Sequence, residues 1–329
     1  MSTAGRPAGT PASAPARASE AGWASQHERS SLWALRLMRW IAVGAGRPLA
    51  RCALHPIALY FLLVNASARR ASLAYLSRAL GRRAGWHDAY RHIHRFASTI
   101  LDRVYFLQDR HELFDVIDSG AEAVTSSLAR GEGVMLIGAH FGSFEALRAS
   151  GAVRGVKVAM LMFEENARLI NAALAAVAPN VEMHTIALGK PSAMLTLRRW
   201  LDAGGLAGLL ADRTLPGHSD RSRNVQIDFL GAPARFSEGP FRLAAMLKRK
   251  VVFMAGLYQG GNHYDLRFVE LADFSANGAP TGESTDARVS AATLRYAALL
   301  EALCRESPYS WFNFFDFWAP DADDQTASL

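Results

Sequence analysis

Hydrophobic residues from about residue 113 onward fall into two alternating patterns. Short continuous apolar runs of strand length end in turn residues, and stretches with apolar residues at helical spacing follow them. Strands that alternate with helices predict an α/β fold, with a mixed, mostly parallel sheet covered on both faces. The predicted strands are residues 133–140, 156–163, 181–188, 205–213 and 250–258, with 264–271 as a late edge strand. The predicted helices are residues 144–152, 166–179, 192–204 and 236–249.

The N-terminal part of the chain has a helical pattern and a different composition. Residues 1–24 are rich in Ala, Ser, Pro and Gly, which is typical of a disordered tail, and they contain no apolar region of the kind that a secretory signal peptide needs. Apolar residues then repeat at helical spacing from Trp33 to Ile41, with arginines between them. The apolar stretch from Cys52 to Val64 is too short to span a bilayer. This combination predicts an interfacial membrane anchor, and a helical hairpin packed on the core is the alternative.

These patterns divide the chain into four parts. We predict a disordered tail over residues 1–24 and a helical N-terminal extension with the interfacial anchor over residues 25–112. An α/β domain follows over residues 113–320, and a C-terminal tail over residues 321–329. A domain of this length can bury a sizeable core.

The charge balance favours acidic partners. The chain carries a formal net charge of +6 at pH 7 and has a pI near 9.6, which fits nucleic acid, anionic lipid headgroups or an acidic carrier protein. Because the arginines are dispersed along the sequence, a mildly basic soluble protein is an equal alternative. The two cysteines, Cys52 and Cys304, have no pair spacing, so we expect two small core residues and no disulfide or zinc site.

One histidine stands where a predicted strand ends. His140 closes the apolar run from Val134, and Glu145 follows in the first turn of the next predicted helix. Ligands of open α/β sheets bind at the carboxyl ends of the strands, and Gly138 and Gly142 leave room there for backbone and ligand. A histidine oriented by Glu145 would act as a general base, and helix-opening amides would stabilise negative charge on a reacting oxygen. The alternative is a glutamate that stabilises the helix dipole beside an unrelated histidine.

Asp212 and Arg213 end another predicted strand, so we expect them at the same edge of the sheet. Arg213 is a candidate for contact with an anionic acceptor group or for ordering the loop, with Asp212 positioning it, and a structural ion pair is the alternative. The motifs of other enzyme classes are missing from the sequence. The chain has no G-x-S-x-G turn of a serine hydrolase, no G-x-x-x-x-G-K-[ST] loop of a nucleotide enzyme and no G-x-G-x-x-G spacing for a dinucleotide.

The ordered set of motifs resembles a known family. The spacing from His140 to Glu145, after an apolar strand, is similar to the H-x-x-x-x-[D/E] motif of the lysophospholipid acyltransferase superfamily. The Asp-Arg pair and the segment "FLGAPARFSEGP" at residues 229–240 resemble its bacterial lipid A lauroyl/myristoyltransferase branch. The ending "YSWFNFFDFW" at residues 309–318 is similar to predicted acyltransferases that are associated with aryl-polyene pigment gene sets. The resemblance covers roughly residues 25–320.

This resemblance implies an αβα-layered acyltransferase in which His140 and Glu145 form the catalytic dyad. A fatty acyl group would move from an acyl thioester to a hydroxyl or amine of a lipid or lipid-like acceptor. The donor would be acyl carrier protein or coenzyme A, with the carrier protein favoured, and no metal, other cofactor or nucleic acid is expected. The missing signal peptide places the expected anchor on the cytoplasmic face of the bacterial inner membrane. The substrate-binding residues that the resemblance suggests are Gly142, Ser143, Asp212, Arg213, Glu238 and Gly239.

Two positions depart from the family pattern. Arg213 stands where a Gln or His-type residue usually follows the aspartate. The Glu238-Gly239-Pro240 segment lacks the Thr-Arg that completes the phosphate-binding block of the glycerolipid branch, which argues against glycerol phosphate as the acceptor.

Other features leave alternatives open. Seven aromatic residues between Tyr309 and Trp318 fit either a lipid contact or a C-terminal core, and we favour core. A non-catalytic membrane-surface protein that binds or delivers lipid is the alternative function. The basic residues that would dock an acidic carrier protein, with a solvated face as the alternative, are Arg198, Arg199, Lys248, Arg249 and Lys250.

Overall fold

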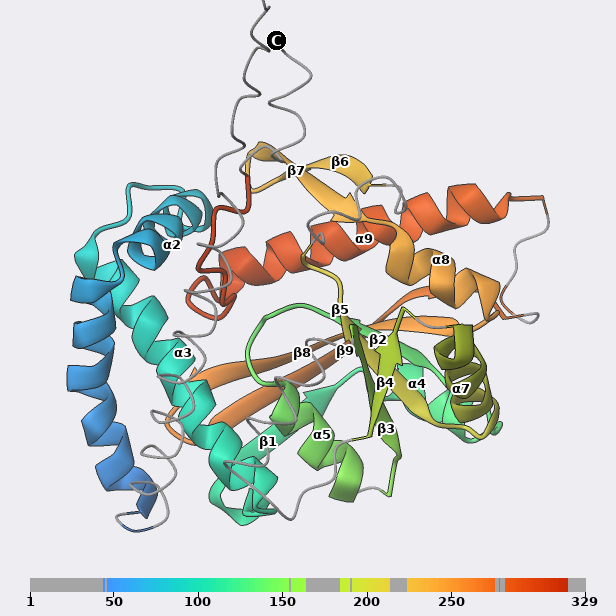
Figure 1. Ribbon diagram of the computed structural model, residues 1–329, viewed down its shortest axis with the longest axis horizontal. Helices are drawn as coiled ribbons and strands as arrows, with labels where there is room; N and C mark the ends of the chain where they lie inside the picture. The colour runs from blue at the N-terminus through green and yellow to red at the C-terminus, as the bar shows by residue number, and fades with distance from the viewer. Residues whose placement is uncertain are drawn as a thin grey trace, which may run out of the picture.

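A seven-stranded sheet forms the centre of the molecule (Figure 1). The computed structural model describes residues 44, 46–153, 155–163, 184–189, 191–213, 224–275, 278 and 282–318. The strand order is β1-β9-β8-β2-β5-β3-β4. The strands are β1 (Asp115–Ser119), β2 (Met135–Gly138), β3 (Val158–Phe163), β4 (Thr185–Leu188), β5 (Leu206–Leu210), β8 (Lys250–Gly260) and β9 (His263–Asp273).

The sheet confirms the predicted α/β class. Its neighbouring strands are parallel except for β8 and β9, which pair antiparallel through a tight turn. The prediction that residues 264–271 form an edge strand is wrong, because β1 pairs with the outer side of β9. A second sheet is the hairpin of β6 (Asn224–Phe229) and β7 (Ala232–Ser237), in a region whose turn residues suggested a loop.

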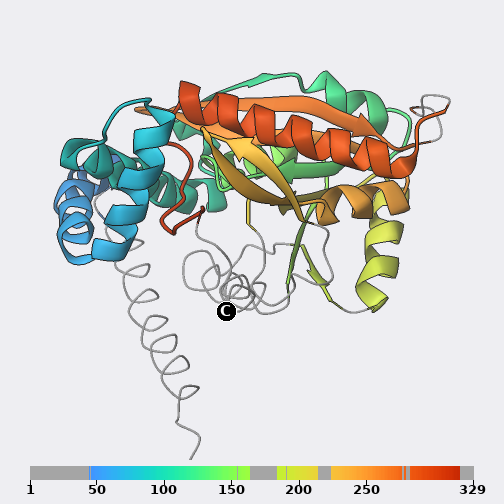
Figure 2. The ribbon, with the colours of Figure 1, turned by 90° about the horizontal axis from the view of Figure 1, so that it is seen from above.

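Helices cover both faces of the main sheet. On one face α8 (Gly239–Met246) and α9 (Thr285–Glu306) pack with the β6–β7 hairpin, and Figure 2 shows α9 running along the length of the sheet. On the other face α4 (Glu122–Leu128) and α5 (Phe144–Val153) cover the side chains of Leu136, Val252 and Met254. The helix α7 (Pro191–Asp202) precedes β5. Alternate residues of β2 therefore enter two separate apolar cores.

The N-terminal helices lie at the end of the sheet where β8 finishes (Figure 1). A helix over Gly46–Val64 is followed by α2 (Ala66–Ala79) and α3 (Trp86–Leu107), and the short 3₁₀ helix η1 (His111–Leu113) leads into β1. The predicted helix over 166–179, the amphipathic residues from Trp33 to Ile41 and both predicted tails lie outside the described residues.

The helix Gly46–Val64 has one buried face and one exposed apolar face. Its buried residues, Ala50, Leu54, Ala58 and Leu62, pack into two apolar clusters with the rest of the protein. The helix is long and apolar enough to cross a membrane by length and composition, and only 22% of it is buried. Cys52 is exposed on it, so the prediction that this cysteine is a core residue is wrong, whereas Cys304 is buried as predicted. The exposed large apolar residues are Leu49, Leu59, Tyr60, Phe61, Leu63 and Val64.

Candidate functional site

The parallel register of β2 and β5 brings His140 and Asp212 together. Gly138 is paired with Leu210, so the residues two positions further along each chain leave the sheet side by side. His140 Nδ1 lies 2.8 Å from Asp212 Oδ1. An ionised carboxylate only accepts hydrogen bonds, so we assign the proton to Nδ1. The other ring nitrogen, Nε2, can then accept a proton; it makes no hydrogen bond with the residues that the structure describes, and the side chain is 32% exposed.

Asp212 is buried and fully hydrogen-bonded. Its Oδ2 accepts the backbone N–H of His140 at 3.0 Å and the indole N–H of Trp311 at 2.8 Å. Burial raises the pKa of the Asp212 carboxyl, but the charge of the neighbouring imidazole and these hydrogen bonds outweigh that effect and hold the pKa below its usual value. Asp212 is therefore an anion at neutral pH.

The C-terminal segment holds this pair in place. Trp311 is fully buried, and the backbone N–H of Phe312 donates to the carbonyl oxygen of His140 at 2.7 Å. The carbonyl oxygen of Trp311 lies 2.8 Å from Nε2 of His92 on α3. Burial lowers the pKa of His92 to about 4, so this histidine is neutral at physiological pH. Burial of Tyr309, Trp311, Phe312 and Asn313 confirms that this part of the aromatic segment is core.

Glu145 has a different partner from the one that its spacing predicts. Its Oε1 lies 2.7 Å from Nε of Arg103 on α3, and the side chain is 10% exposed. The imidazole of His140 is instead oriented by Asp212. The prediction that Glu145 orients His140 is therefore corrected: the glutamate joins α5 to α3 through Arg103.

The turn after His140 requires glycine, and two of its amides are already hydrogen-bonded. Gly142 has φ 71°, and a Cβ there would overlap the carbonyl oxygen of Gly256 on β8. Its N–H donates to the carbonyl oxygen of Ser310, and the N–H of Ser143 donates to that of Gly256. These two amides are therefore not the donors that we expected for a negatively charged reacting oxygen. Ser143 Oγ accepts the N–H of Ala146 and caps the start of α5.

The remaining predicted substrate-binding residues, Arg213, Glu238 and Gly239, lie in two different places. Arg213 follows Asp212, and its guanidinium carbon lies 5.1 Å from the ring centroid of Phe315. Burial lowers the pKa of Arg213, and the charge of Asp212 opposes that shift. Glu238 is buried and binds Arg242 through Oε2 at 2.8 Å and Ser290 through Oε1 at 2.7 Å. Oε1 thus joins the start of α8, where Gly239 lies, to α9, and Oε2 binds an arginine on α8 itself.

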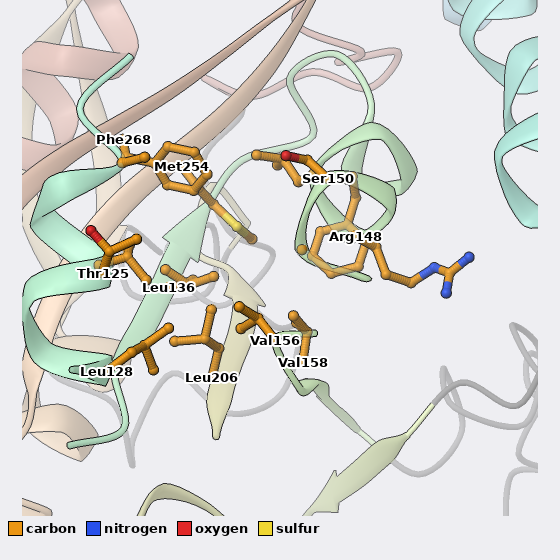
Figure 3. Close-up of a pocket in the computed structure, with 15 residues that line it drawn as sticks. Thr125, Leu128, Leu136, Arg148, Ser150, Val156, Val158, Leu206, Met254 and Phe268 are labelled. Carbon is orange, nitrogen blue, oxygen red and sulfur yellow. The ribbon is translucent and has the colours of Figure 1, made fainter. Parts of the chain in front are cut away.

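A small apolar cavity, with a free volume of about 50 Å³, lies between the sheet and helices α4 and α5 (Figure 3). Phe144 and Met254 lie at its end near the His140 turn, since both contact the position where Gly208 lacks a side chain, and Met254 also contacts Gly138. In Figure 3 the guanidinium of Arg148 points away from the apolar lining. The apolar residues that line the cavity include Val124, Leu128, Leu136, Leu147, Val156, Val158, Leu206 and Phe268.

The basic residues predicted to dock an acidic carrier protein lie at the opposite end of the strands from His140. Because β2, β5 and β8 are parallel, the start of β8 at Lys250 and the end of α7 lie where these strands begin. Asp202 contacts both Arg198 and Arg249, and Lys250 lies 3.0 Å from Glu270. Nearby acidic residues therefore neutralise part of this surface, and it does not adjoin the candidate site.

The comparison with protein families agrees with the motifs. The model of the family described as bacterial lipid A biosynthesis acyltransferase matches residues 23–319, which include both His140 and Asp212. No curated protein matches the chain significantly. The match covers nearly the whole chain, and it identifies the protein as an acyltransferase enzyme of lipid biosynthesis. The chain therefore belongs to the bacterial lipid A biosynthesis acyltransferase family.

Proposed function

We propose that the protein transfers a fatty acyl group from an acyl thioester to a hydroxyl or amine of a lipid A-like acceptor, with His140 as general base. The observation that carries this proposal is the bond from Nδ1 of His140 to the buried carboxylate of Asp212, which leaves Nε2 as the proton-accepting nitrogen at the carboxyl ends of β2 and β5. Glu145, the residue that the family motif pairs with His140, keeps a positioning role through Arg103.

The proposed reaction needs no covalent enzyme intermediate. The acceptor oxygen or nitrogen attacks the thioester carbonyl while Nε2 of His140 takes its proton. The C–S bond then breaks, and the imidazolium returns the proton to the leaving thiolate. Asp212 stabilises the imidazolium between these two proton transfers, because its carboxylate is held as an anion by hydrogen bonds from Trp311 and from the backbone of His140.

The apolar cavity between the sheet and α5 is the proposed place of the acyl chain. It begins at Phe144 and Met254, beside the strand end that carries His140, and its described lining is mostly apolar. A chain that enters there buries its methylene groups, each of which contributes about 0.8 kcal/mol. The depth of the cavity would then limit the chain length that the enzyme accepts.

Filling the cavity is expected to shorten the preferred acyl chain. A Cβ at Gly151 on α5 would lie 3.6 Å from Val158 Cγ2, in ordinary contact, so Gly151→Val adds methyl groups without overlap at the Cβ. Each methylene that no longer fits loses about 0.8 kcal/mol, which is about fourfold in kcat/KM. The measurement is kcat/KM over a series of donor chain lengths, with Gly151→Ala as the smaller step. An equal loss for every chain length would contradict this placement.

We also propose that the exposed apolar face of helix Gly46–Val64 lies in the membrane surface, as expected for a membrane-associated family. The opposite face packs through Leu54, Ala58 and Leu62, so the helix lies along the domain instead of leaving it. Acyl thioesters are cytoplasmic metabolites, which favours the cytoplasmic face of the inner membrane. The basic charge of the chain favours acyl carrier protein over coenzyme A as the donor.

Polar substitutions on this face are expected to release the protein from membranes. Leu59 and Leu63 are 49% and 57% exposed, and each leucine that enters the bilayer interface contributes about 1.5–3 kcal/mol. The double change Leu59→Ser and Leu63→Ser should therefore lower vesicle binding by at least about 100-fold in a flotation assay. Leu195→Ser, at a similarly exposed leucine on α7, is the matched control and should bind as the wild type does. Equal binding by the wild type, the double variant and the control would contradict the proposal that this face anchors the protein to the membrane.

The experiment that tests the function is a reaction with purified components. Wild-type protein, acyl carrier protein thioester and a lipid A precursor are combined, and the lipid is analysed by mass spectrometry. The account predicts an increase in lipid mass by one acyl group, with loss of one free thioester per product. A protein that only binds or delivers lipid would leave the mass of the lipid unchanged.

A further inference from the structure

Two arginine and two histidine side chains meet where helix Gly46–Val64 contacts α3. Arg51 and His55 lie one turn apart on the first helix, and His94 and Arg95 are neighbours on α3. The rings of His55 and His94 stack with their centroids 4.6 Å apart. The guanidinium carbons of Arg51 and Arg95 lie 5.6 and 5.3 Å from the ring centroid of Tyr258 on β8. We call Arg51, His55, His94 and Arg95 the cationic cluster.

The carboxylate beside this cluster is already occupied. Asp102 is fully buried, binds Arg47 through both oxygens at 2.8 and 2.9 Å, and accepts the hydroxyl of Tyr264 at 2.9 Å. Nη1 of Arg51 lies 3.9 Å from it, beyond hydrogen-bond distance. Arg95 donates to the carbonyl oxygen of Tyr258, which carries no net charge. Within the described part of the chain, the positive charge of the cluster thus exceeds the negative charge in contact with it.

Two buried nitrogen atoms of the cluster lack a hydrogen bond within the described residues. They are Nη1 of Arg51 and Nε2 of His94. Burial lowers the pKa of His94, and the nearby charges of His55, Arg51 and Arg95 lower it further. Burial and the charge of Arg91 likewise lower the pKa of Arg95. Buried donors that lack a hydrogen bond in a positive field cost stability unless an anion accepts them.

We infer that the cationic cluster binds the phosphate group of a membrane lipid. Guanidinium groups bind phosphate through paired, charge-assisted hydrogen bonds, and the side chains of Arg51 and His55 are accessible from outside. The same helix exposes Leu59 and Leu63 one and two turns further along, so a lipid could place its phosphate on the cluster and its acyl chains along that face. The occupant is therefore a lipid and not a free anion.

The cluster lies near the carboxyl ends of the strands, where His140 also lies. Tyr258 is two residues beyond Gly256, whose carbonyl oxygen accepts the N–H of Ser143 in the turn after His140. A phosphorylated lipid on the cluster would thus lie beside the candidate active site. This inference rests on the membrane contact proposed above, and it does not depend on the chemistry of His140.

The experiment compares soluble lipids with the full-length protein by titration calorimetry. The ligands are dihexanoyl-phosphatidate, dihexanoyl-phosphatidylcholine and inorganic phosphate, with no thioester donor present. The proteins are the wild type, Arg51→Gln, Arg95→Gln, His140→Ala and the control Arg130→Gln, which removes one positive charge at the turn between α4 and β2. We expect the wild type to bind phosphatidate at least about 10-fold more tightly than either other ligand. Loss of one charge-assisted bond should weaken this binding about 10-fold or more in each cluster variant.

The control variants distinguish lipid binding at the cluster from acyl transfer at His140 and from an effect of net charge. Arg130→Gln and His140→Ala should bind phosphatidate within about twofold of the wild type, so a failure of acyl transfer would leave the result intact. Equal weakening by Arg130→Gln would show that only net charge matters, and equal binding of inorganic phosphate would show an ion site without lipid recognition. Either outcome overturns the inference. If a glutamine variant does not fold, a wild-type protein that binds phosphatidate and phosphatidylcholine equally overturns it as well.

Discussion

Replacing His140 with alanine is expected to lower the turnover number for acyl transfer by about 10²–10⁴-fold, the usual contribution of a general base. The side chain that supplies the free Nε2 is removed, while the carboxylate of Asp212 and the surrounding core remain. The measurement is the steady-state rate of thioester consumption with a lipid acceptor. Circular dichroism and thermal unfolding should show that the variant stays folded.

A matched control exists elsewhere in the chain. His263 on β9 lies 3.0 Å from Asp115 on β1, forming another histidine–aspartate pair that is largely exposed. His263→Ala removes a comparable contact away from the proposed chemistry and should keep at least about half of the wild-type rate. Near-normal turnover by a folded His140→Ala protein would show that another group removes the acceptor proton.

Replacing Asp212 with asparagine is expected to cost roughly 10²–10³-fold in turnover, more than replacing Glu145 with glutamine. An amide in place of the carboxylate carries no charge to stabilise the imidazolium. If its NH₂ group faces Nδ1, it also favours the tautomer that protonates Nε2. Glu145→Gln keeps a hydrogen-bond acceptor for Arg103 and leaves the His140–Asp212 bond in place. We expect a loss of about 10-fold or less for that variant, with part of the effect on stability.

For Asp212→Asn and Glu145→Gln, both the turnover number and the unfolding temperature should be measured. A large effect of Asp212→Asn on turnover, with a small effect on unfolding, would support the orienting role. The reverse order, with Glu145→Gln much slower than Asp212→Asn, would restore the pairing that the motif spacing suggests and would contradict the hydrogen bonds of the structure.

The sequence was sufficient to predict the α/β class and the edge of the sheet where His140 and Asp212 lie. Apolar runs that end in a polar residue identify buried parallel strands, and the ends of such strands share an edge. Their contact follows only from the register, because a shift of β5 by one residue would turn Asp212 to the other face. Sequence spacing therefore could not choose between Asp212 and Glu145 as the partner of His140.

The other predictions that the structure corrects failed for local physical reasons. β1 is short and mostly exposed, so it has no apolar pattern to reveal that β9 is covered on its outer side. Pro233 and Gly231 indicate a loop in the segment that forms the β6–β7 hairpin. Arg103 lies on α3, far from Glu145 in the sequence, and no periodicity relates the two. Contacts between distant elements of this kind depend on packing, which a single sequence does not record.

A double-mutant cycle on the rate of acyl transfer tests whether His140 and Asp212 act as one unit. Residues that act as one unit are not additive, because once His140 is absent Asp212 has no imidazolium to stabilise. The account predicts that the combined His140→Ala and Asp212→Asn protein is no slower than His140→Ala alone, within about twofold. A further loss equal to that of Asp212→Asn in the wild-type background would show that the two residues act independently, and would contradict the proposed pair.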